Sequence, residues 1–152
     1  MLDEGNYYLR VIAGDTATRY TLDLQVVSAP TPEGGNGFAD AAYTGYEYVT
    51  RSYLMDSMNG DDRRDYSKLT VSSSRTADIL LQTLRGDASM EPLADLNGNG
   101  VRDEDEVVAT SANTGVLQDR ITAQLSAGVT YYLRIYRAVE VNTLYQLALS
   151  SL

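Results

Sequence analysis

Acidic and amide side chains in residues 95–106 follow the spacing of a calcium-binding loop. The sequence DLNGNGVRDEDE matches the pattern D-x-[DN]-x-[DN]-G-x5-E at every position. Calcium is a hard cation that takes about six to eight oxygen ligands, and a tight loop can bring those oxygens to one centre. We therefore expect Ca²⁺ as the cofactor. The predicted ligands are Asp95, Asn97, Asn99, the carbonyl of Val101, Asp103 and Glu106.

Two residues of this loop have special roles in the prediction. Gly100 permits the sharp turn after the first three ligands, and Glu106 closes the site as a bidentate ligand. The alternative interpretation is an Asn-Gly-rich β-turn with acidic residues for solubility. A turn alone does not require acid or amide side chains at all five spaced positions. With three carboxylates, we expect an affinity near the extracellular range of about 10⁻⁴–10⁻³ M.

The residues on either side of the loop argue against an EF-hand. An EF-hand needs an entering and an exiting helix. Here Pro92 comes just before the loop, and VVATS (107–111), which is rich in β-branched residues, follows it. The sequence therefore predicts a calcium loop between two strands.

The rest of the chain shows the period-2 alternation of half-buried strands. We expect strands at 6–13, 20–26, 45–54, 65–72, 77–84, 106–111, 121–125, 129–135 and 145–149. Residues 38–43 (FADAAY) could form a single helical turn, and no longer helix is indicated. The predicted fold class is all-β, an antiparallel β-sandwich of the jelly-roll kind.

The chain contains an internal repeat. Residues 5–25 resemble residues 128–150, and both carry YYLR followed by an alternating strand. We expect 1–27 to be the C-terminal β-hairpin of a preceding copy, 28–36 a linker and 37–152 one whole sandwich. Because a lone hairpin is marginally stable, it would dock on this domain or be donated to a neighbouring molecule. Donation would give a homo-oligomer or a filament.

Composition excludes several classes of function. The 152 residues include no Cys and no His, which excludes Cys/His zinc sites and catalysis by Ser-His-Asp or Cys-His groups. The net charge of -9 argues against nucleic acid as a partner. No apolar run reaches the roughly 18–20 residues needed to span a bilayer. SSS (72–74) lacks the frame of a nucleophile elbow, so we expect no enzyme activity.

The start of the sequence, MLDEGNYYLR, lacks the basic and apolar regions of a signal peptide. We expect the sequence to be an internal piece of a longer protein.

GGNGFADAA (34–42) is similar to a calcium nonapeptide repeat, but Asp40 comes one residue late, so a linker is the preferred interpretation.

Two weaker candidates remain. Asp61, Asp62 and Asp65 could form a second cation site, or a solvated turn in which Arg63 and Arg64 pair with the acids. The chain has twelve Tyr and no Trp, and a cluster of four could form a sugar- or polymer-binding face or fill the rim of a thin sandwich. These four are Tyr43, Tyr46, Tyr48 and Tyr53.

Three stretches resemble the bacterial pre-peptidase C-terminal domain. They are residues 60–83, 92–111 and 125–150, although AGVTYYLRIY carries one residue more than the family pattern. The resemblance implies a non-catalytic β-sandwich in a secreted or cell-surface protein. It also implies stabilisation by calcium, because some members of the family use calcium. In this chain the implication applies to the predicted ligands of the loop and to no other residues. A related module of collagenases binds collagen, but no residue here indicates a collagen site.

These observations give one preferred function and one alternative. We expect a non-catalytic, calcium-binding extracellular module with a structural or assembly role, which self-associates through the N-terminal hairpin. The alternative is a carbohydrate- or matrix-protein-binding accessory module of a secreted enzyme.

Overall fold

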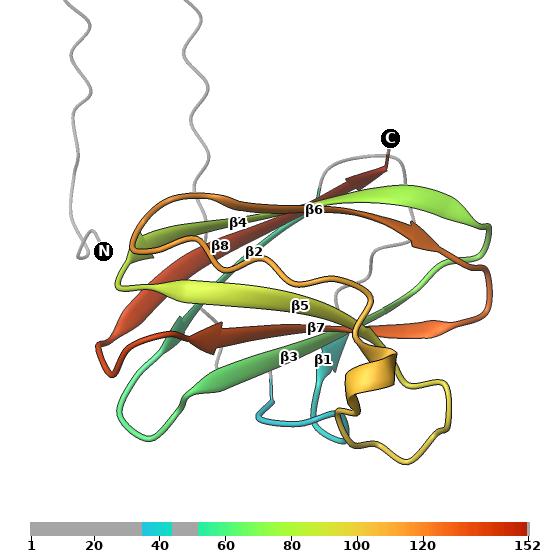
Figure 1. The fold of residues 1–152 in the computed structure, drawn as a ribbon, viewed down its shortest axis with the longest axis horizontal. Helices are drawn as coiled ribbons and strands as arrows, with labels where there is room; N and C mark the ends of the chain where they lie inside the picture. The colour runs from blue at the N-terminus through green and yellow to red at the C-terminus, as the bar shows by residue number, and fades with distance from the viewer. Residues whose placement is uncertain (1–34, 44–51, 152) are drawn as a thin grey trace, which may run out of the picture.

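The computed structural model describes residues 35–43 and 52–151, which form two facing β-sheets (Figure 1). The expected hairpin at 1–27 and most of the expected linker and Tyr-rich segment lie outside the described residues. The first sheet has the order β1 (Ala42–Tyr43), β3 (Arg64–Thr70), β7 (Thr130–Arg137), β5 (Ala88–Ala94). The second has the order β2 (Ser52–Met58), β8 (Thr143–Ser151), β4 (Arg75–Arg85), β6 (Asp119–Leu125). The predicted all-β sandwich is confirmed.

The order of the strands is that of a jelly roll. Each connection between successive strands from β2 to β8 crosses from one sheet to the other. The sandwich strands pair antiparallel, while the two-residue β1 adds to the edge of β3 in parallel. The only helix in the described residues is the 3₁₀ turn η1 (Glu104–Glu106).

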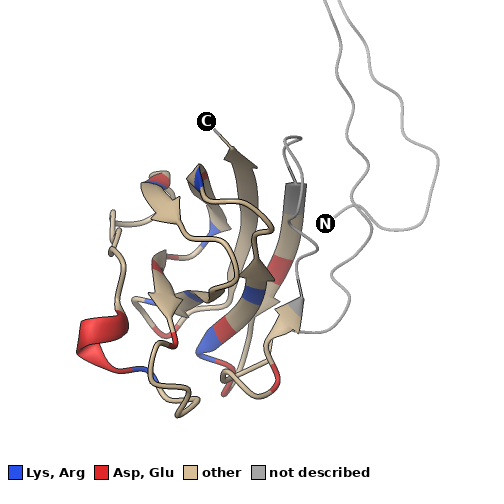
Figure 2. Cartoon of the chain, turned by 90° about the vertical axis from the view of Figure 1, so that its right-hand side faces the viewer, with Lys and Arg blue, Asp and Glu red and all other residues tan. Residues whose placement is uncertain are grey.

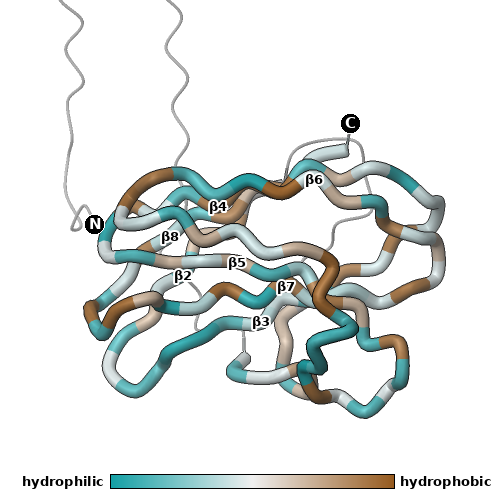
Figure 3. Tube along the Cα trace, viewed as in Figure 1, coloured by the Kyte–Doolittle hydropathy of each residue, from teal (hydrophilic) through white to brown (hydrophobic). Residues whose placement is uncertain are grey.

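The core lies between the sheets and follows the predicted alternation. Along β6, Ile121, Ala123 and Leu125 are buried, and the residues between them are exposed. Hydrophilic and hydrophobic residues likewise succeed one another along β7 (Figure 3). Burying one face of each strand in this way is the main source of stability in a sandwich.

A second, smaller apolar cluster lies on the outer face of the first sheet. The Phe38 ring stacks on Tyr132 with centroids 4.1 Å apart and meets Tyr66 edge-on at 5.4 Å. Leu93 of β5 is fully buried in the same cluster. Residues from outside the sandwich therefore cover part of this sheet.

The segment that carries Phe38 was expected to contain one helical turn over 38–43, and that expectation is only half right. Residues 38–40 form a turn, but Ala42 and Tyr43 continue as β1. The Asp40 carboxylate accepts hydrogen bonds from the N–H groups of Asn36 (3.2 Å) and Gly37 (2.8 Å). An Asp side chain that bonds backbone amides in this way competes with helix formation.

One expectation around the predicted calcium loop is completed and another is corrected. A strand before the loop was expected, but no bounds were assigned to it; it is β5, whose sequence ASMEPLA does not alternate and contains Pro92. The strand expected at 106–111 is not continuous: only Val107 and Ser111 form bridges, to Leu93 and Met90 of β5. All seven residues of β5 are buried, so this strand is covered on both faces.

The repeated YYLR sequence is in β7, and the alternating strand that follows it is β8. These two strands lie in different sheets and do not pair with each other. The sequence that residues 5–25 resemble therefore forms two strands of opposite sheets, and not a hairpin.

Candidate metal site

The predicted calcium loop follows β5, ends in η1 and projects from one end of the sandwich (Figure 1). Residues 96–101 at its tip are exposed, while Asp95 and Asp103 at its base are half-buried. Glu106, the expected closing ligand, is buried with 3% of its surface exposed. Carboxylates are almost never buried unless they are paired or bind a cation.

Backbone N–H groups of the loop bond to its own side chains. Gly100 N–H donates to Asp95 Oδ2 at 3.2 Å, so position 6 of the motif bonds to position 1. Asn99 N–H donates to Asn97 Oδ1 at 2.8 Å, and Val101 N–H donates to Asn99 Oδ1 at 2.7 Å. Gly100 has φ +68°, which favours glycine. The motif therefore folds as a series of Asx turns that curl around its centre.

Glu106 closes the loop from its far end. Its Oε1 accepts hydrogen bonds from the N–H groups of Leu96 (2.9 Å) and Asn97 (3.2 Å). Its Oε2 is buried and has no hydrogen-bond partner among the described residues, and the same is true of Asp95 Oδ1. Two buried carboxylate oxygens, from the first and last positions of the motif, are thus left for another partner.

Asp103 bonds to the two Asn side chains of the loop. Its Oδ2 accepts hydrogen bonds from the Nδ2 groups of both Asn97 and Asn99, each at 2.8 Å. Rotation of an Asn amide by half a turn about χ2 exchanges its nitrogen and oxygen, so the same two side chains can present oxygens.

The six predicted ligands are brought into one loop but not around a single point. Asp95 bonds to the backbone of the turn, Asp103 to two amides, and Glu106 to the entering backbone. Within the described part of the chain, no three Asp, Glu, His or Cys side chains are grouped so that they could hold a metal by themselves. A calcium site here would therefore need the Asn and carbonyl oxygens together with the carboxylates.

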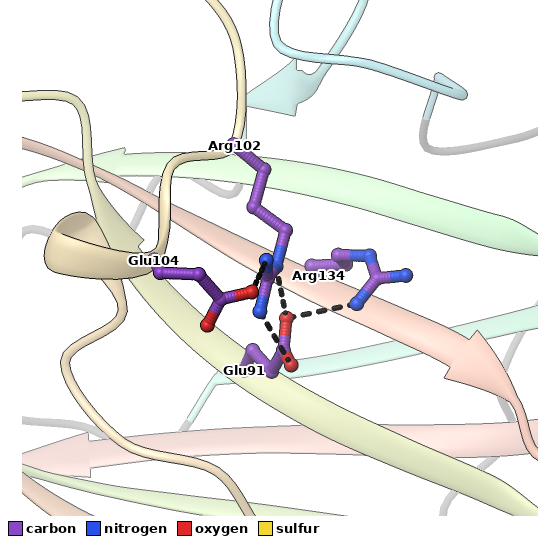
Figure 4. Close-up of polar contacts among 4 residues, drawn as sticks. All are labelled: Glu91, Arg102, Glu104 and Arg134. Carbon is purple, nitrogen blue, oxygen red and sulfur yellow. Dashed lines mark hydrogen bonds and ion pairs between the residues drawn. The ribbon is translucent and has the colours of Figure 1, made fainter.

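An ion-pair network ties the loop to the first sheet (Figure 4). The Arg102 guanidinium donates to both carboxylate oxygens of Glu91 on β5, at 2.8 and 3.2 Å, and to Glu104 at 2.6 Å. Arg134 of β7 donates to Glu91 at 2.8 Å and lies 4.2 Å over the Tyr136 ring. Arg102 therefore anchors the middle of the loop through the buried Glu91.

The electrostatics around the loop follow from this network. Burial alone would raise the pKa of Glu91, but the hydrogen bonds and charges of Arg102 and Arg134 outweigh it and lower that pKa. Burial and the negative charge of Asp95 raise the pKa of Tyr132. The acidic η1 stands at the edge of the molecule (Figure 2).

The sequence prediction did not include Arg102, Glu91 or Arg134. Two signals were present. Arg102 is the one basic residue within the acidic loop, and Glu91 is a charge in a short segment of largely uncharged residues. A lone charge at a buried position of a strand indicates a paired partner.

The second candidate cation site has a different arrangement. Asp61 is exposed, whereas Asp65 is buried and accepts a hydrogen bond from the Tyr145 hydroxyl at 2.7 Å. Arg63 pairs with Glu140 rather than with the acids of its own turn.

The predicted Tyr cluster is largely outside the described residues. This applies to all of Tyr46 and Tyr48 and to the side chains of Tyr43 and Tyr53.

Comparison with known proteins gives solved structures but no family. The sequence matches no protein-family model and no curated protein. A search of the helices in the described residues found none that could span a membrane.

Three solved structures share the fold. The pre-peptidase C-terminal domain of a collagenase from Bacillus anthracis is 18% identical, with a TM-score of 0.52, and the match covers 80% of this chain and 100% of that domain. PliG of Aeromonas hydrophila, a periplasmic inhibitor of g-type lysozyme, is 15% identical, with a TM-score of 0.55 over 73% of this chain and 95% of its own. The Yersinia pseudotuberculosis-derived mitogen is 11% identical, with a TM-score of 0.50 over 68% of this chain and 86% of its own. At these identities the likeness concerns the fold alone, a β-sandwich that the pre-peptidase C-terminal domain of the collagenase shares.

Proposed function

We propose that this chain is a non-catalytic, calcium-binding β-sandwich module with a structural role in an extracellular or cell-surface protein. The observation that carries the proposal is the pair of buried carboxylate oxygens, Asp95 Oδ1 and Glu106 Oε2, which have no hydrogen-bond partner among the described residues. They belong to the first and last positions of a calcium motif, and a buried anion of this kind needs a compensating charge.

Calcium would act as a cross-link in a chain that has no cysteine. The loop holds five carboxylates within twelve residues, three of them at predicted ligand positions, and their mutual repulsion opposes closure of the loop. A bound divalent cation removes that repulsion and stabilises the folded state by mass action. Arg102 already fixes the middle of the loop through Glu91. The entropic cost of ordering the loop when calcium binds is therefore smaller.

Calcium titration of the full chain tests this proposal. Isothermal titration calorimetry should show one site per chain, and thermal melts should give a higher Tm in calcium than in chelator. Magnesium at the same concentration should give a smaller shift, because it demands near-ideal octahedral geometry and loses its bound waters reluctantly. Absence of both heat and a shift in Tm would refute calcium binding.

Self-association is the second part of the proposal. Residues 5–25 share the sequence pattern of β7 and β8, which are the central strands of the two sheets. A pair of strands of this type needs two sheets to cover it, and a neighbouring copy of the domain could provide them. Sedimentation of the full chain and of a version lacking residues 1–27 should give different oligomeric states. A monomer in both samples would argue against strand donation.

The alternative role, binding a carbohydrate or matrix protein as an accessory module of a secreted enzyme, has less support. The aromatic residues described on the outer face of the first sheet are used in packing: Phe38 stacks on Tyr132 and contacts Tyr66. Tyr136 lies under the guanidinium of Arg134. A glycan array and a matrix-protein pulldown with the calcium-loaded chain would detect such binding.

A further inference from the structure

The segment that follows the predicted calcium loop closes the outer edge of β5. We call residues 107–111 the edge segment. It runs antiparallel to β5, with bridges from Val107 to Leu93 and from Ser111 to Met90. An open strand edge presents unpaired N–H and C=O groups that can pair with another chain, so its coverage matters for solubility.

The two ends of the edge segment are held by different contacts. At the Ser111 end, Ser111 and Met90 exchange two backbone hydrogen bonds, at 2.9 and 3.0 Å. The buried Asp119 of β6 adds two more through Oδ1, from Ser111 Oγ at 2.6 Å and from Asn113 N–H at 2.8 Å. This end is therefore fixed by contacts that do not involve the loop.

At the Val107 end the contacts include the loop itself. Val108 N–H donates to the Pro92 carbonyl at 2.9 Å, and Val107 N–H donates to the Glu104 carbonyl of η1 at 3.4 Å. The Val107 side chain packs against the cluster that contains Leu93, and Pro92 has no N–H to give in return to Val108. The residue just before Val107 is Glu106, the last ligand of the predicted site.

Glu106 links this end to the state of the loop. Its side chain is buried, Oε1 holds the entering backbone of the loop, and Oε2 has no partner in the described part of the chain. Without a cation, a buried and incompletely paired carboxylate is strongly disfavoured, and rotation of Glu106 into water would relieve it. Such a rotation would break the hydrogen bonds from Leu96 and Asn97 to Oε1 and so release the residue that precedes Val107 from the entering backbone of the loop.

On this basis we infer that calcium at the loop controls closure of the edge segment on β5. The Val107 end is closed when calcium is bound and opens when calcium is removed, while the Ser111 end stays closed in both states. The inference rests on the proposed calcium site. It adds a regulated element, since opening would expose the backbone of Pro92 and the buried side chain of Leu93.

Amide hydrogen exchange of the full chain, read by NMR in calcium and in chelator, tests the inference. The Val108 amide should exchange on the order of tenfold faster in chelator. The Ser111 and Met90 amides, and those of the central strand β8, should change much less. Protection of the β8 amides in chelator also shows that the domain remains folded.

Calcium binding is measured on the same sample by calorimetry, which separates the two possible failures. No binding would overturn the proposed function and this inference together. Binding with equal protection of Val108 in both conditions would overturn the inference alone. Loss of protection at Ser111 and Met90 together with Val108 would also overturn it, because the segment would then open as one unit.

A substitution at the fixed end provides the matched control. Ser111→Ala removes the side-chain hydrogen bond to Asp119 and should speed exchange of the Ser111 amide equally with and without calcium. If the effect of Ser111→Ala disappears in calcium, the two ends are not independent and the inference is wrong.

Discussion

The Tyr145 hydroxyl of β8 donates a 2.7 Å hydrogen bond to the Asp65 carboxylate of β3, and both side chains are fully buried. These strands belong to opposite sheets, so the bond joins the two halves of the sandwich through the core. A hydrogen bond to a buried charge contributes more than one between neutral groups.

Tyr145→Phe should therefore lower the free energy of unfolding by about 1–3 kcal/mol, measured by urea denaturation at pH 7. Tyr136→Phe is a useful comparison because it makes the same change at a half-buried tyrosine of β7. Equal stability of Tyr145→Phe and the native chain would contradict a stabilising role for this bond.

The same pair predicts a dependence on alkaline pH. Burial and the charges of Asp65 and Asp56 raise the pKa of Tyr145 well above its ordinary value. A group whose folded pKa is raised contributes stability that is present below its unfolded pKa, about 10 for Tyr, and is lost as pH rises above it. The native chain should lose stability above about pH 10 more steeply than Tyr145→Phe, as measured by denaturation at a series of pH values.

Arg102→Met should destabilise the domain by about 2 kcal/mol in the absence of calcium. The substitution removes one of the two arginines that pair with the buried Glu91 in the described residues, and only Arg134 is left. Glu104→Gln, which alters the exposed partner of Arg102, should change stability far less. Denaturation in chelator measures both variants. Similar losses in the two would argue that the contact with Glu91 is not the important one.

Acid pH should reduce the effect of Arg102→Met. The pKa of Glu91 is lowered in the folded state, so its contribution is present above the unfolded pKa, about 4.3, and is lost as pH falls through the folded value. The stability difference between native and variant chains should shrink at about pH 3. A difference that stays constant between pH 7 and pH 3 would exclude the Glu91 carboxylate as its source.

Glu106→Gln and Asp95→Asn should each weaken calcium binding on the order of tenfold or more, because each removes a charged ligand from the ends of the motif. Asp105→Asn is the matched control, since Asp105 is an exposed acid next to Glu106 that is not at a ligand position. Calorimetry measures all three. Equal weakening by Asp105→Asn would mean that net charge, and not coordination, determines the affinity.

Gly100→Ala should destabilise the loop by about 1–2 kcal/mol, since a side chain at φ +68° is strained. No heavy atom lies within 4 Å of the position that its Cβ would occupy, so crowding does not contribute. A thermal melt and a calcium titration of this variant should show both a lower Tm and a weaker affinity. An unchanged affinity would mean that the turn at Gly100 is not required for binding.

The sequence predicts β6, β7 and β8 well because they alternate, whereas β2 ends at Met58, four residues beyond the strand expected at 45–54. Ile121, Ala123 and Leu125 of β6 are buried as expected. The sequence does not predict the bounds of β5, where Glu91 and Pro92 interrupt the pattern. Both residues are tolerated there because later parts of the chain cover them: Arg102 pairs with Glu91, and Val108 bonds to the Pro92 carbonyl.

The candidate site shows a similar division. Spacing alone makes Asp95, Asn97 and the other motif residues candidate ligands and predicts a tightly turned loop, because short-range geometry determines the turns at Asn97 and Asn99. The burial of Glu106 and the anchoring of Arg102 could not be predicted, since they depend on contacts between segments that are separate in sequence.

The interleaved order of the strands also constrains how the domain forms. Strand β7 lies between β3 and β5, and β8 lies between β2 and β4, so each sheet has one inner strand that comes from the end of the sequence. Strand β4 can pair with β6 before β8 is present, but β2 pairs with no described strand of its sheet except β8, and β5 with none except β7. Long-range pairing of this kind raises contact order and slows folding. During synthesis the domain should therefore remain incompletely folded until β8 has left the ribosome, which gives chaperones a period in which to act.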